Sequence, residues 1–252
     1  MNFPHLFAPI DINAMELKNR IVMTAMHLGY TPEGEVTERL IDFYAVRAKG
    51  GVGLIIVGGC PIDELGGMAG MISIHNDRFV PGLQKLTSVV KSHGAKIAAQ
   101  LYQAGRYTHS SMIGGQKPFS ASAVRSKLTG ETPRALELDE IPTVQAKFAE
   151  AAIRAQRAEF DAVEILGSAG YLISQFLSPL TNLRQDCYGG SLENRMRFGL
   201  EVVSKVREAV GPGYPILIRL AGSLICIRFL SALTLAFIWL SHPLQFMESA
   251  ME

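Results

Sequence analysis

The chain has 252 residues, of which 48% are apolar and 19% charged, and its formal net charge is +1. These values predict a globular protein with a large core, not a disordered chain. A near-neutral charge without long Lys/Arg runs excludes the electrostatic footprint of nucleic-acid binding. The cysteines Cys60, Cys187 and Cys226 are far apart, which argues against a disulfide framework or a zinc or iron–sulfur site. With no signal-peptide pattern at the N-terminus, we expect a cytoplasmic protein.

Short apolar runs alternate along the chain with amphipathic helical patterns. Each run has few polar positions, as expected for parallel strands that are buried on both faces. The predicted strands are Arg20–Met26, Val52–Gly58, Lys96–Leu101, Ala162–Leu166 and Pro215–Leu220.

Four helical patterns separate these strands. The first follows the turn at 31–34 and stops at Gly50-Gly51, and the second begins at Pro81 and ends at His93-Gly94. The third follows Pro142, and the fourth runs from near Ser191 to Gly211-Pro212. The residues expected to be buried on them are Ile41, Tyr44, Ala45 and Ala48; Leu83, Leu86 and Val90; Val144, Phe148, Ala151 and Ala155; and Met196, Leu200, Val203 and Val210.

Strand–helix alternation of this kind indicates a parallel sheet with right-handed crossovers, either an open doubly wound sheet or a closed barrel. No G-x-G-x-x-G follows the first strand, so the dinucleotide fingerprint of the open sheet is missing. Polar, Gly-rich segments instead follow successive strands: HLGYTPEGE, GCPIDELGG, YQAGRYTHS and GSAGYLISQ. In a barrel such segments converge on one face and build the active site. We therefore predict an α/β fold of the TIM-type (β/α)8 class, truncated after the fifth strand.

The last thirty or so residues read differently. Residues 1–223 form the predicted partial barrel, and residues 224–252 form an aberrant hydrophobic tail that contains the run LICIRFLSALTLAFIWL. Three interpretations of the tail are open: a non-native C-terminus produced by a frameshift or early stop, a buried helix, or a membrane tail anchor. A membrane span is not favoured, because the run is at the lower length limit and contains Arg228.

Several ordered motifs over residues 3–223 carry a family resemblance: LKNRIVM, AKGGVGLII, AAQLYQAGR, GYLISQFLSPLTNLR and YGGSLENRMRF. Together they resemble the Old Yellow Enzyme family of NADH:flavin oxidoreductases, most of all its 2,4-dienoyl-CoA reductase and 2-enoate reductase branch. The resemblance implies FMN as cofactor and NAD(P)H as electron donor. The longer relatives also carry an iron–sulfur cluster and FAD beyond the barrel, and neither is expected in this chain.

The resemblance assigns two chain segments to the flavin ring. Gly58 and Gly59, after the second strand, match the position where backbone meets the flavin O4 side. The segment after the first strand matches the residues that lie along the N5 edge: Thr24, Ala25, Met26 and His27.

Two polar side chains on strands complete the implied cofactor site. Gln100 matches the residue that pairs with the flavin pyrimidine edge, which needs both a donor and an acceptor, as a primary amide offers. Arg219 matches the arginine near N1 and O2, where a positive charge stabilises the anionic reduced flavin. As alternatives, either side chain could belong to an internal polar network, and His27 could be an ordinary histidine.

Reduction of an activated C=C bond needs a proton donor beside the hydride source. Tyr171 resembles the proton-donating tyrosine of the dienoyl-CoA reductase branch; a packing role is the alternative. Many family members bind the substrate carbonyl with a His/His or His/Asn pair, and the matching residues here are Leu166 and Ala169. This departure favours an acyl-CoA-type substrate over a quinone or enone.

The resemblance therefore implies an FMN-dependent ene-reductase that acts on unsaturated enoate or acyl-CoA substrates. One alternative is a truncated, inactive derivative with weak or no FMN binding. Another is a membrane-tethered or partner-completed protein without catalysis. The sequence does not determine the substrate, the choice between NADH and NADPH, or the oligomeric state.

Overall fold

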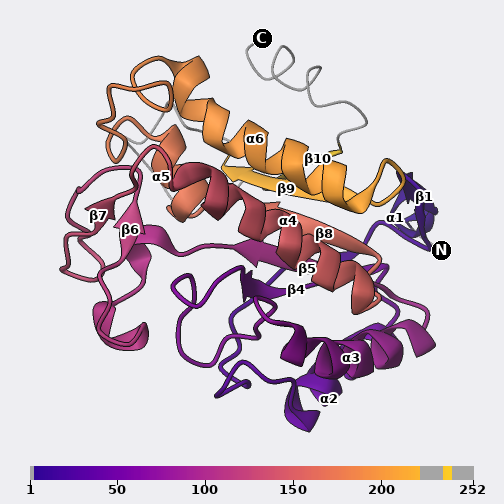
Figure 1. The fold of residues 1–252 in the computed structure, drawn as a ribbon. Coiled ribbons are helices and arrows are strands. Elements are labelled where there is room, and N and C mark those ends of the chain that lie inside the picture. Colours follow the sequence, from indigo (N-terminus) through magenta and orange to yellow (C-terminus); the bar gives the residue numbers. More distant parts are fainter. Residues whose placement is uncertain (1–2, 222–234, 240–252) are drawn as a thin grey trace.

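The computed structural model describes residues 3–221 and 235–239. Its main sheet has the strand order β10-β9-β8-β5-β4-β3, with the bounds given in the next paragraph. In this sheet β3, β4, β5, β8 and β9 are parallel, and β10 is antiparallel to β9. Consecutive parallel strands are neighbours and the sheet curls (Figure 1), which is the arrangement of a TIM-type barrel wall. The described chain thus contributes five parallel strands of such a barrel, in agreement with the predicted fold class.

The five predicted strands are all present, one with the predicted bounds and four with shifted ends. The last three differ little from the prediction, whereas the first is much shorter and the second continues three residues further. The observed bounds are β3 (Val22–Met23), β4 (Leu54–Pro61), β5 (Lys96–Tyr102), β8 (Ala162–Leu166) and β9 (Ile216–Ala221), and β10 is Leu235–Trp239.

Helices cover the outer face of the sheet. Figure 1 shows α4 and α6 lying side by side, with α2 and α3 as a second pair; α4 packs on β5 and β8, and α3 packs on β5. Their bounds are α2 (Glu38–Lys49), α3 (Val80–Ser92), α4 (Ile141–Arg157) and α6 (Leu192–Val210). Thr37 and Ser191 cap α2 and α6 through their hydroxyls, and Pro81 and Pro142 occupy first turns, where proline costs no hydrogen bond.

One of the four predicted helix faces is only partly right: on α6, Val203 and Val210 are buried as predicted, but the other two residues are not. Leu200 is exposed and Met196 is only half-buried on α6, while Phe198, Val202 and Val206 are buried. The buried stripe is therefore rotated from the predicted one, and the sheet and α4 decide which stripe faces inward.

Alternate residues of each strand face opposite sides of the sheet. Ile55, Val57 and Ile97 belong to the large core under the helices. The intervening residues form a second, smaller core on the inner face: Leu54, Ile56, Ala98, Ala162 and Leu217. Two apolar faces explain why these strands read as continuous apolar runs.

A hairpin that the sequence analysis did not predict closes the inner core at the N-terminal ends of the strands. After the short helix α1 (Pro4–Phe7), β1 (Ile10–Ile12) pairs antiparallel with β2 (Met15–Leu17). Met15 and Leu17 are buried against the inner-face residues. In Figure 1 this hairpin lies at the opposite end of the molecule from the long loops.

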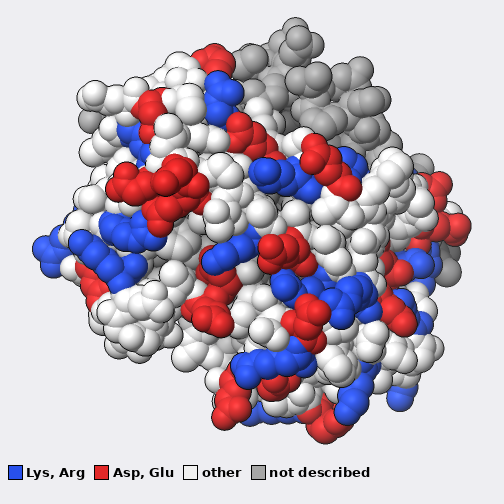
Figure 2. Space-filling view, viewed as in Figure 1, with Lys and Arg blue, Asp and Glu red and all other residues white. Residues whose placement is uncertain are grey.

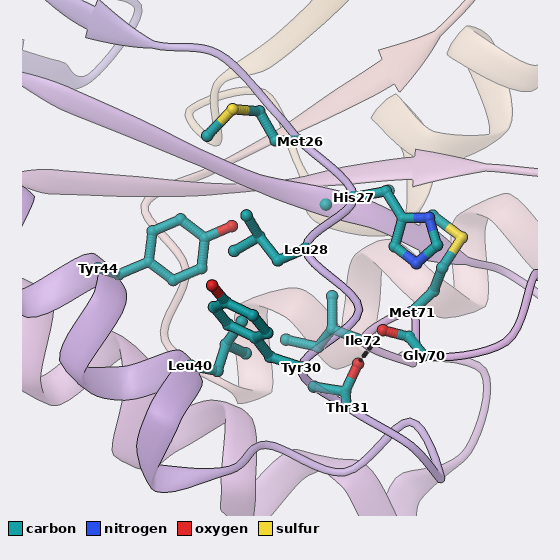
Figure 3. Close-up of a pocket in the computed structure, with 12 residues that line it drawn as sticks. Met26, His27, Leu28, Tyr30, Thr31, Leu40, Tyr44, Gly70, Met71 and Ile72 are labelled. Atoms are coloured by element: carbon teal, nitrogen blue, oxygen red, sulfur yellow. Dashed lines mark hydrogen bonds between the residues drawn. The ribbon is translucent and has the colours of Figure 1, made fainter.

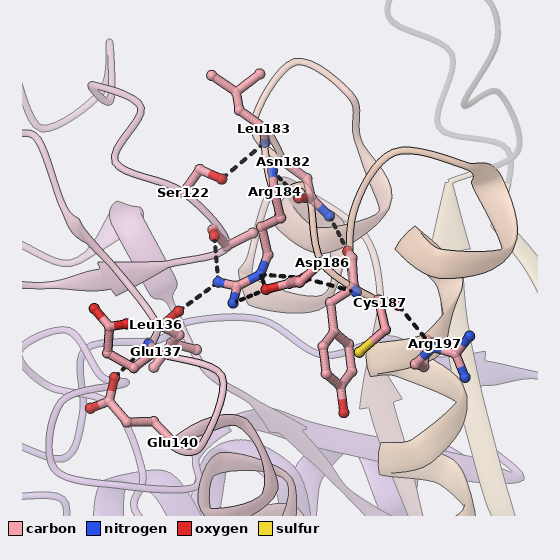
Figure 4. A network of polar contacts seen from close by, with 12 residues as sticks. Ser122, Leu136, Glu137, Glu140, Asn182, Leu183, Arg184, Asp186, Cys187 and Arg197 are labelled. Carbon is pink, nitrogen blue, oxygen red and sulfur yellow. Dashed lines mark hydrogen bonds and ion pairs between the residues drawn. The ribbon is translucent and has the colours of Figure 1, made fainter.

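The long loops at the other end contain β6 (Phe119–Ser120), β7 (Arg134–Ala135), α5 (Leu172–Leu177) and three 3-10 turns, Asp77–Phe79, Gly105–Tyr107 and Ser110–Met112. Arg184 joins these segments (Figure 4): its guanidinium donates to the carbonyls of Ala121 and Leu136 and forms an ion pair with Asp186. Ala121 and Leu136 directly follow β6 and β7. One side chain thus ties the β6–β7 pair to the loop that precedes α6.

Part of the predicted tail is described. Leu235–Trp239 is a strand, so the helix interpretation is wrong for these residues; the rest of 224–252 and the domain boundary at 223 lie outside the described residues. Among the described helices, none has the length and apolar character needed to cross a membrane. Figure 2 shows acidic and basic side chains interleaved over one face, without a single-sign field.

Candidate functional site

The segment that follows β3 lies against the end of β4. A single antiparallel bridge joins Met26 to Gly58, and Gly58-Gly59 is a cis peptide. A Cβ on Gly58 would come within 2.8 Å of the Gln100 Cβ, and one on Gly59 within 2.6 Å of the Tyr102 ring. Glycine is therefore required at both positions, because β5 leaves no room for a side chain.

A small hollow opens beside this bridge. Its lining includes the predicted residues Met26, His27, Gly58 and Gly59, while Tyr44 and Leu40 enter it from α2 (Figure 3). Thr31 Oγ1 donates to the Gly70 carbonyl at 2.7 Å, which fixes the loop on the far side. Met26 and His27 themselves are exposed.

Three polar side chains lie on the inner face near the carboxyl ends of β5, β8 and β9. Gln100 and Glu164 are register partners, and Gln100 Nε2 donates to Glu164 Oε1 at 2.6 Å. Arg219 lies two residues beyond Leu217, the register partner of Glu164, and is half-buried. Burial raises the pKa of Glu164, and the Gln100 hydrogen bond and the Arg219 charge oppose that rise.

Tyr171 stands in an aromatic and sulfur-containing environment. Its ring makes edge-on contacts with Tyr102 and Tyr107, at centroid distances of 5.1 and 6.0 Å. Met71 and Leu166 belong to the same buried cluster. Burial is the main cause that raises the pKa of Tyr171, and the neighbouring Tyr107 raises it further. The phenol therefore keeps its proton at neutral pH.

The loop that carries Tyr171 is held by a buried amide. Gln175 on α5 donates through Nε2 to the carbonyls of Ala104 and Gly170, at 3.0 and 2.7 Å. Gly170 has a φ of +79°, and a Cβ there would collide with the Tyr107 ring. Tyr171 is therefore placed by two neighbouring loops at once.

The expected residues thus fall into adjoining groups. Gly58 contacts Gln100, and Gly59 contacts Tyr102, which packs on Tyr171. Thr24 and Ala25 are half-buried in the segment before Met26, and Ala25 packs on the inner core. The described geometry brings these groups to one end of the sheet, where barrel enzymes place their active sites.

Sequence reasoning missed Glu164, Tyr102 and Tyr107. Glu164 had a visible signal, because it is the one charged residue in the strand AVEIL. The two tyrosines had none, since their contacts with Tyr171 join the end of β5 and its following loop to the separate loop after β8. Leu166, one of the two residues predicted to replace the carbonyl-binding pair, is buried beside Tyr171, and the other, Ala169, is exposed two residues before Tyr171.

A parallel barrel wall with polar side chains on its inner face and a tyrosine in the loop after β8 is the architecture of a barrel enzyme, and comparison with known proteins identifies the class. Residues 5–228 match the model of the NADH:flavin oxidoreductase / NADH oxidase family. The chain belongs to this family, whose members are FMN-dependent and take electrons from NAD(P)H.

Among similar proteins, a metal reductase of Desulforamulus reducens is 61% identical over 218 residues, which is 86% of this chain but 32% of that protein. The structure of morphinone reductase in complex with tetrahydroNAD superposes with a TM-score of 0.83 at 34% identity, covering 92% of this chain and 66% of that one. A 2-naphthoyl-CoA reductase complex gives a TM-score of 0.81 at 32% identity, covering 86% and 35%. The chain thus spans about a third to two thirds of these relatives.

Proposed function

We propose that this chain forms the flavin-ring part of an FMN-dependent site that reduces activated C=C bonds in enoate or acyl-CoA substrates. The observation that carries the proposal is the pairing of a polar row, Gln100, Glu164 and Arg219, with a protonated Tyr171 in an apolar surrounding. Electrons would come from NAD(P)H, as the family's activity implies.

The residues present fit a flavin ring chemically. Gln100 offers a donor and an acceptor, and Arg219 supplies a fixed positive charge close to them. Glu164 Oε2 is a buried oxygen without a hydrogen-bond partner in the described structure. Buried polar atoms are normally hydrogen-bonded, so a polar ligand group at this position would satisfy it. Bound FMN would supply hydride transfer; Gln100 and Arg219 would hold its pyrimidine side, and the segment Thr24–His27 with Gly58 and Gly59 would border the ring.

Tyr171 is the proposed proton donor to the substrate. The environment of Tyr102, Tyr107 and Leu166 disfavours the phenolate, so Oη holds its proton until a more basic carbon forms nearby. The apolar Leu166 offers no hydrogen bond to a ketone oxygen. This supports a thioester substrate, the class named for the 2-naphthoyl-CoA reductase neighbour.

Replacement of the phenol tests this assignment. The full chain, reconstituted with FMN, is reduced by NADH or NADPH and then mixed with an unsaturated acyl-CoA such as crotonyl-CoA, while flavin absorbance is followed. We expect Tyr171→Phe to keep flavin reduction and to slow reoxidation by roughly a hundredfold or more, because the proton donor is lost.

Tyr214→Phe is the matched control, since it removes a phenol that donates to the Phe160 carbonyl away from this end of the sheet. It should leave reoxidation unchanged. Equal reoxidation rates in Tyr171→Phe and wild type would contradict the donor role. A chain that takes up no FMN would contradict the proposed function and favour the truncated, inactive alternative.

A second candidate function is electron transfer to metal ions, supported by the 61% identity to a metal reductase. Outer-sphere electron transfer to a ferric chelate needs no proton from Tyr171. If this is the activity, reduced wild type and Tyr171→Phe should be reoxidised by the chelate at the same rate, while crotonyl-CoA reoxidises neither.

A further inference from the structure

Glu164 is a carboxyl group on the inner face of the barrel wall with 1% of its surface exposed. It lies between Ala162 and Leu166 on the inward side of β8, and both of these neighbours belong to apolar clusters. A carboxyl group at such a place is costly unless its oxygens find partners. An apolar side chain at position 164 would pack on these neighbours without the cost of burying a polar group.

Only half of that carboxyl group is satisfied. Oε1 accepts the 2.6 Å hydrogen bond from Gln100, whereas Oε2 is buried without a partner in the described part of the chain. Glu164 and Gln100 are also direct register partners on adjacent parallel strands, so the backbone holds the two side chains next to each other. The pairing of Gln100 with Glu164 is therefore fixed by the register of β5 and β8.

The consequence concerns the orientation of the Gln100 amide. A primary amide presents N–H groups on one side and an oxygen on the other, and a half-turn exchanges them. A carboxylate only accepts hydrogen bonds, so it selects the orientation in which the amide nitrogen faces it. The amide oxygen of Gln100 then faces away from Glu164.

We propose that Glu164 is a positioning residue for flavin binding, which fixes the Gln100 amide so that its oxygen is offered to a donor on the pyrimidine edge. This inference rests on the proposed flavin function. Burial raises the pKa of Glu164, and the Gln100 hydrogen bond and the Arg219 charge oppose that rise, so both polar neighbours favour the accepting form of the carboxyl group.

The test measures the dissociation constant of FMN for the full chain by quenching of flavin fluorescence. Glu164→Leu cannot accept the amide hydrogen bond and leaves the amide free to turn; we expect FMN affinity to fall about tenfold, as for one hydrogen bond to a charged group. Glu164→Gln can accept through its own amide oxygen and should lose less than about threefold. Should Glu164→Leu be insoluble, Glu164→Met carries the same expectation.

A double-mutant cycle separates positioning from general stability. If Glu164 acts through Gln100, Glu164→Leu should cause no further loss of affinity in a Gln100→Leu background. The matched control is Thr87→Val, which removes a buried hydrogen bond to the Ala158 carbonyl on the outer side. It should lower the melting temperature and leave FMN affinity unchanged.

The outcomes distinguish this inference from the function on which it rests. Wild type that takes up no FMN overturns both. Wild type that binds FMN while Glu164→Leu binds equally well overturns only the positioning role. The same tenfold loss in the Gln100→Leu background also overturns it, because Glu164 would then act independently of the amide.

Discussion

Ala169 adopts a left-handed backbone conformation, with a φ of +58°, two residues before Tyr171. For a residue with a Cβ this conformation costs roughly 1–2 kcal/mol, and glycine or asparagine adopts it more readily. The exposed side chain makes no compensating core contact. The strain is thus a local consequence of having alanine where the loop needs a positive φ.

Replacement of Ala169 by glycine should relieve that strain. We expect Ala169→Gly to raise the free energy of unfolding by about 0.5–1 kcal/mol, after allowance for the greater freedom of glycine in the unfolded chain. Urea denaturation measures the difference. The control Ala45→Gly, inside α2, should lower stability by about 1 kcal/mol. A loss of stability in both variants would contradict the strain argument.

At the scale of elements, the link between Arg184 and Asp186 holds the β6–β7 pair to the loop before α6. The Arg184 side chain is only 9% exposed, and its hydrogen bonds lower the pKa of Asp186. A lowered folded-state pKa gives stability that is present above the unfolded value and lost as pH falls through the folded value.

Asp186→Asn should therefore be less stable than wild type by about 1 kcal/mol at pH 7, a figure that allows for solvent screening of the pair. The difference should shrink as the pH falls below the unfolded value of about 4, because wild type then loses the same interaction. Urea titrations between pH 3 and 7 give the two curves. Asp11→Asn, exposed on β1, is the control and should track wild type; a pH-independent deficit in Asp186→Asn would refute the linkage.

At the scale of the whole molecule, Cys60 reports on the opening of the main core. It is fully buried on β4, and burial raises the pKa of its thiol to about 12. Cys187 is exposed. A thiol of this kind reacts only when the structure around it opens, because both access and the thiolate are required.

Alkylation by iodoacetamide, followed by mass spectrometry of the peptides, should label Cys187 rapidly and Cys60 only slowly. The Cys60 rate should rise in urea in parallel with the unfolding transition, since labelling follows the open population. A Cys187→Ser variant should leave the Cys60 rate unaltered. Equal labelling of Cys60 and Cys187 in native buffer would show that the main core does not shield Cys60 from the reagent.

Much of this architecture could be predicted because each strand is buried on both faces. Runs such as AVEIL and PILIRL carry that double burial in their composition, and Gly and Pro residues mark the helix ends. The partly wrong face on α6 has the opposite cause: Leu200 and Val203 are both apolar and both were predicted to be buried, and only packing against α4 and the sheet decides that Val203 is buried and Leu200 is not. Short elements such as the β1–β2 hairpin leave too weak a periodicity to be recognised.

For the candidate site, the sequence by itself determined the type of side chain available at each strand end: an amide, a guanidinium, a phenol and paired glycines. Those identities follow from local motifs that need no knowledge of neighbours. Only the tertiary structure decided that Glu164 faces Gln100, that Tyr102 and Tyr107 enclose Tyr171, and that Gly58 and Gly59 leave no room for a Cβ. The physical reason is that hydrogen bonding, desolvation and close packing act between residues brought together by strand register, and register is set by the folded sheet.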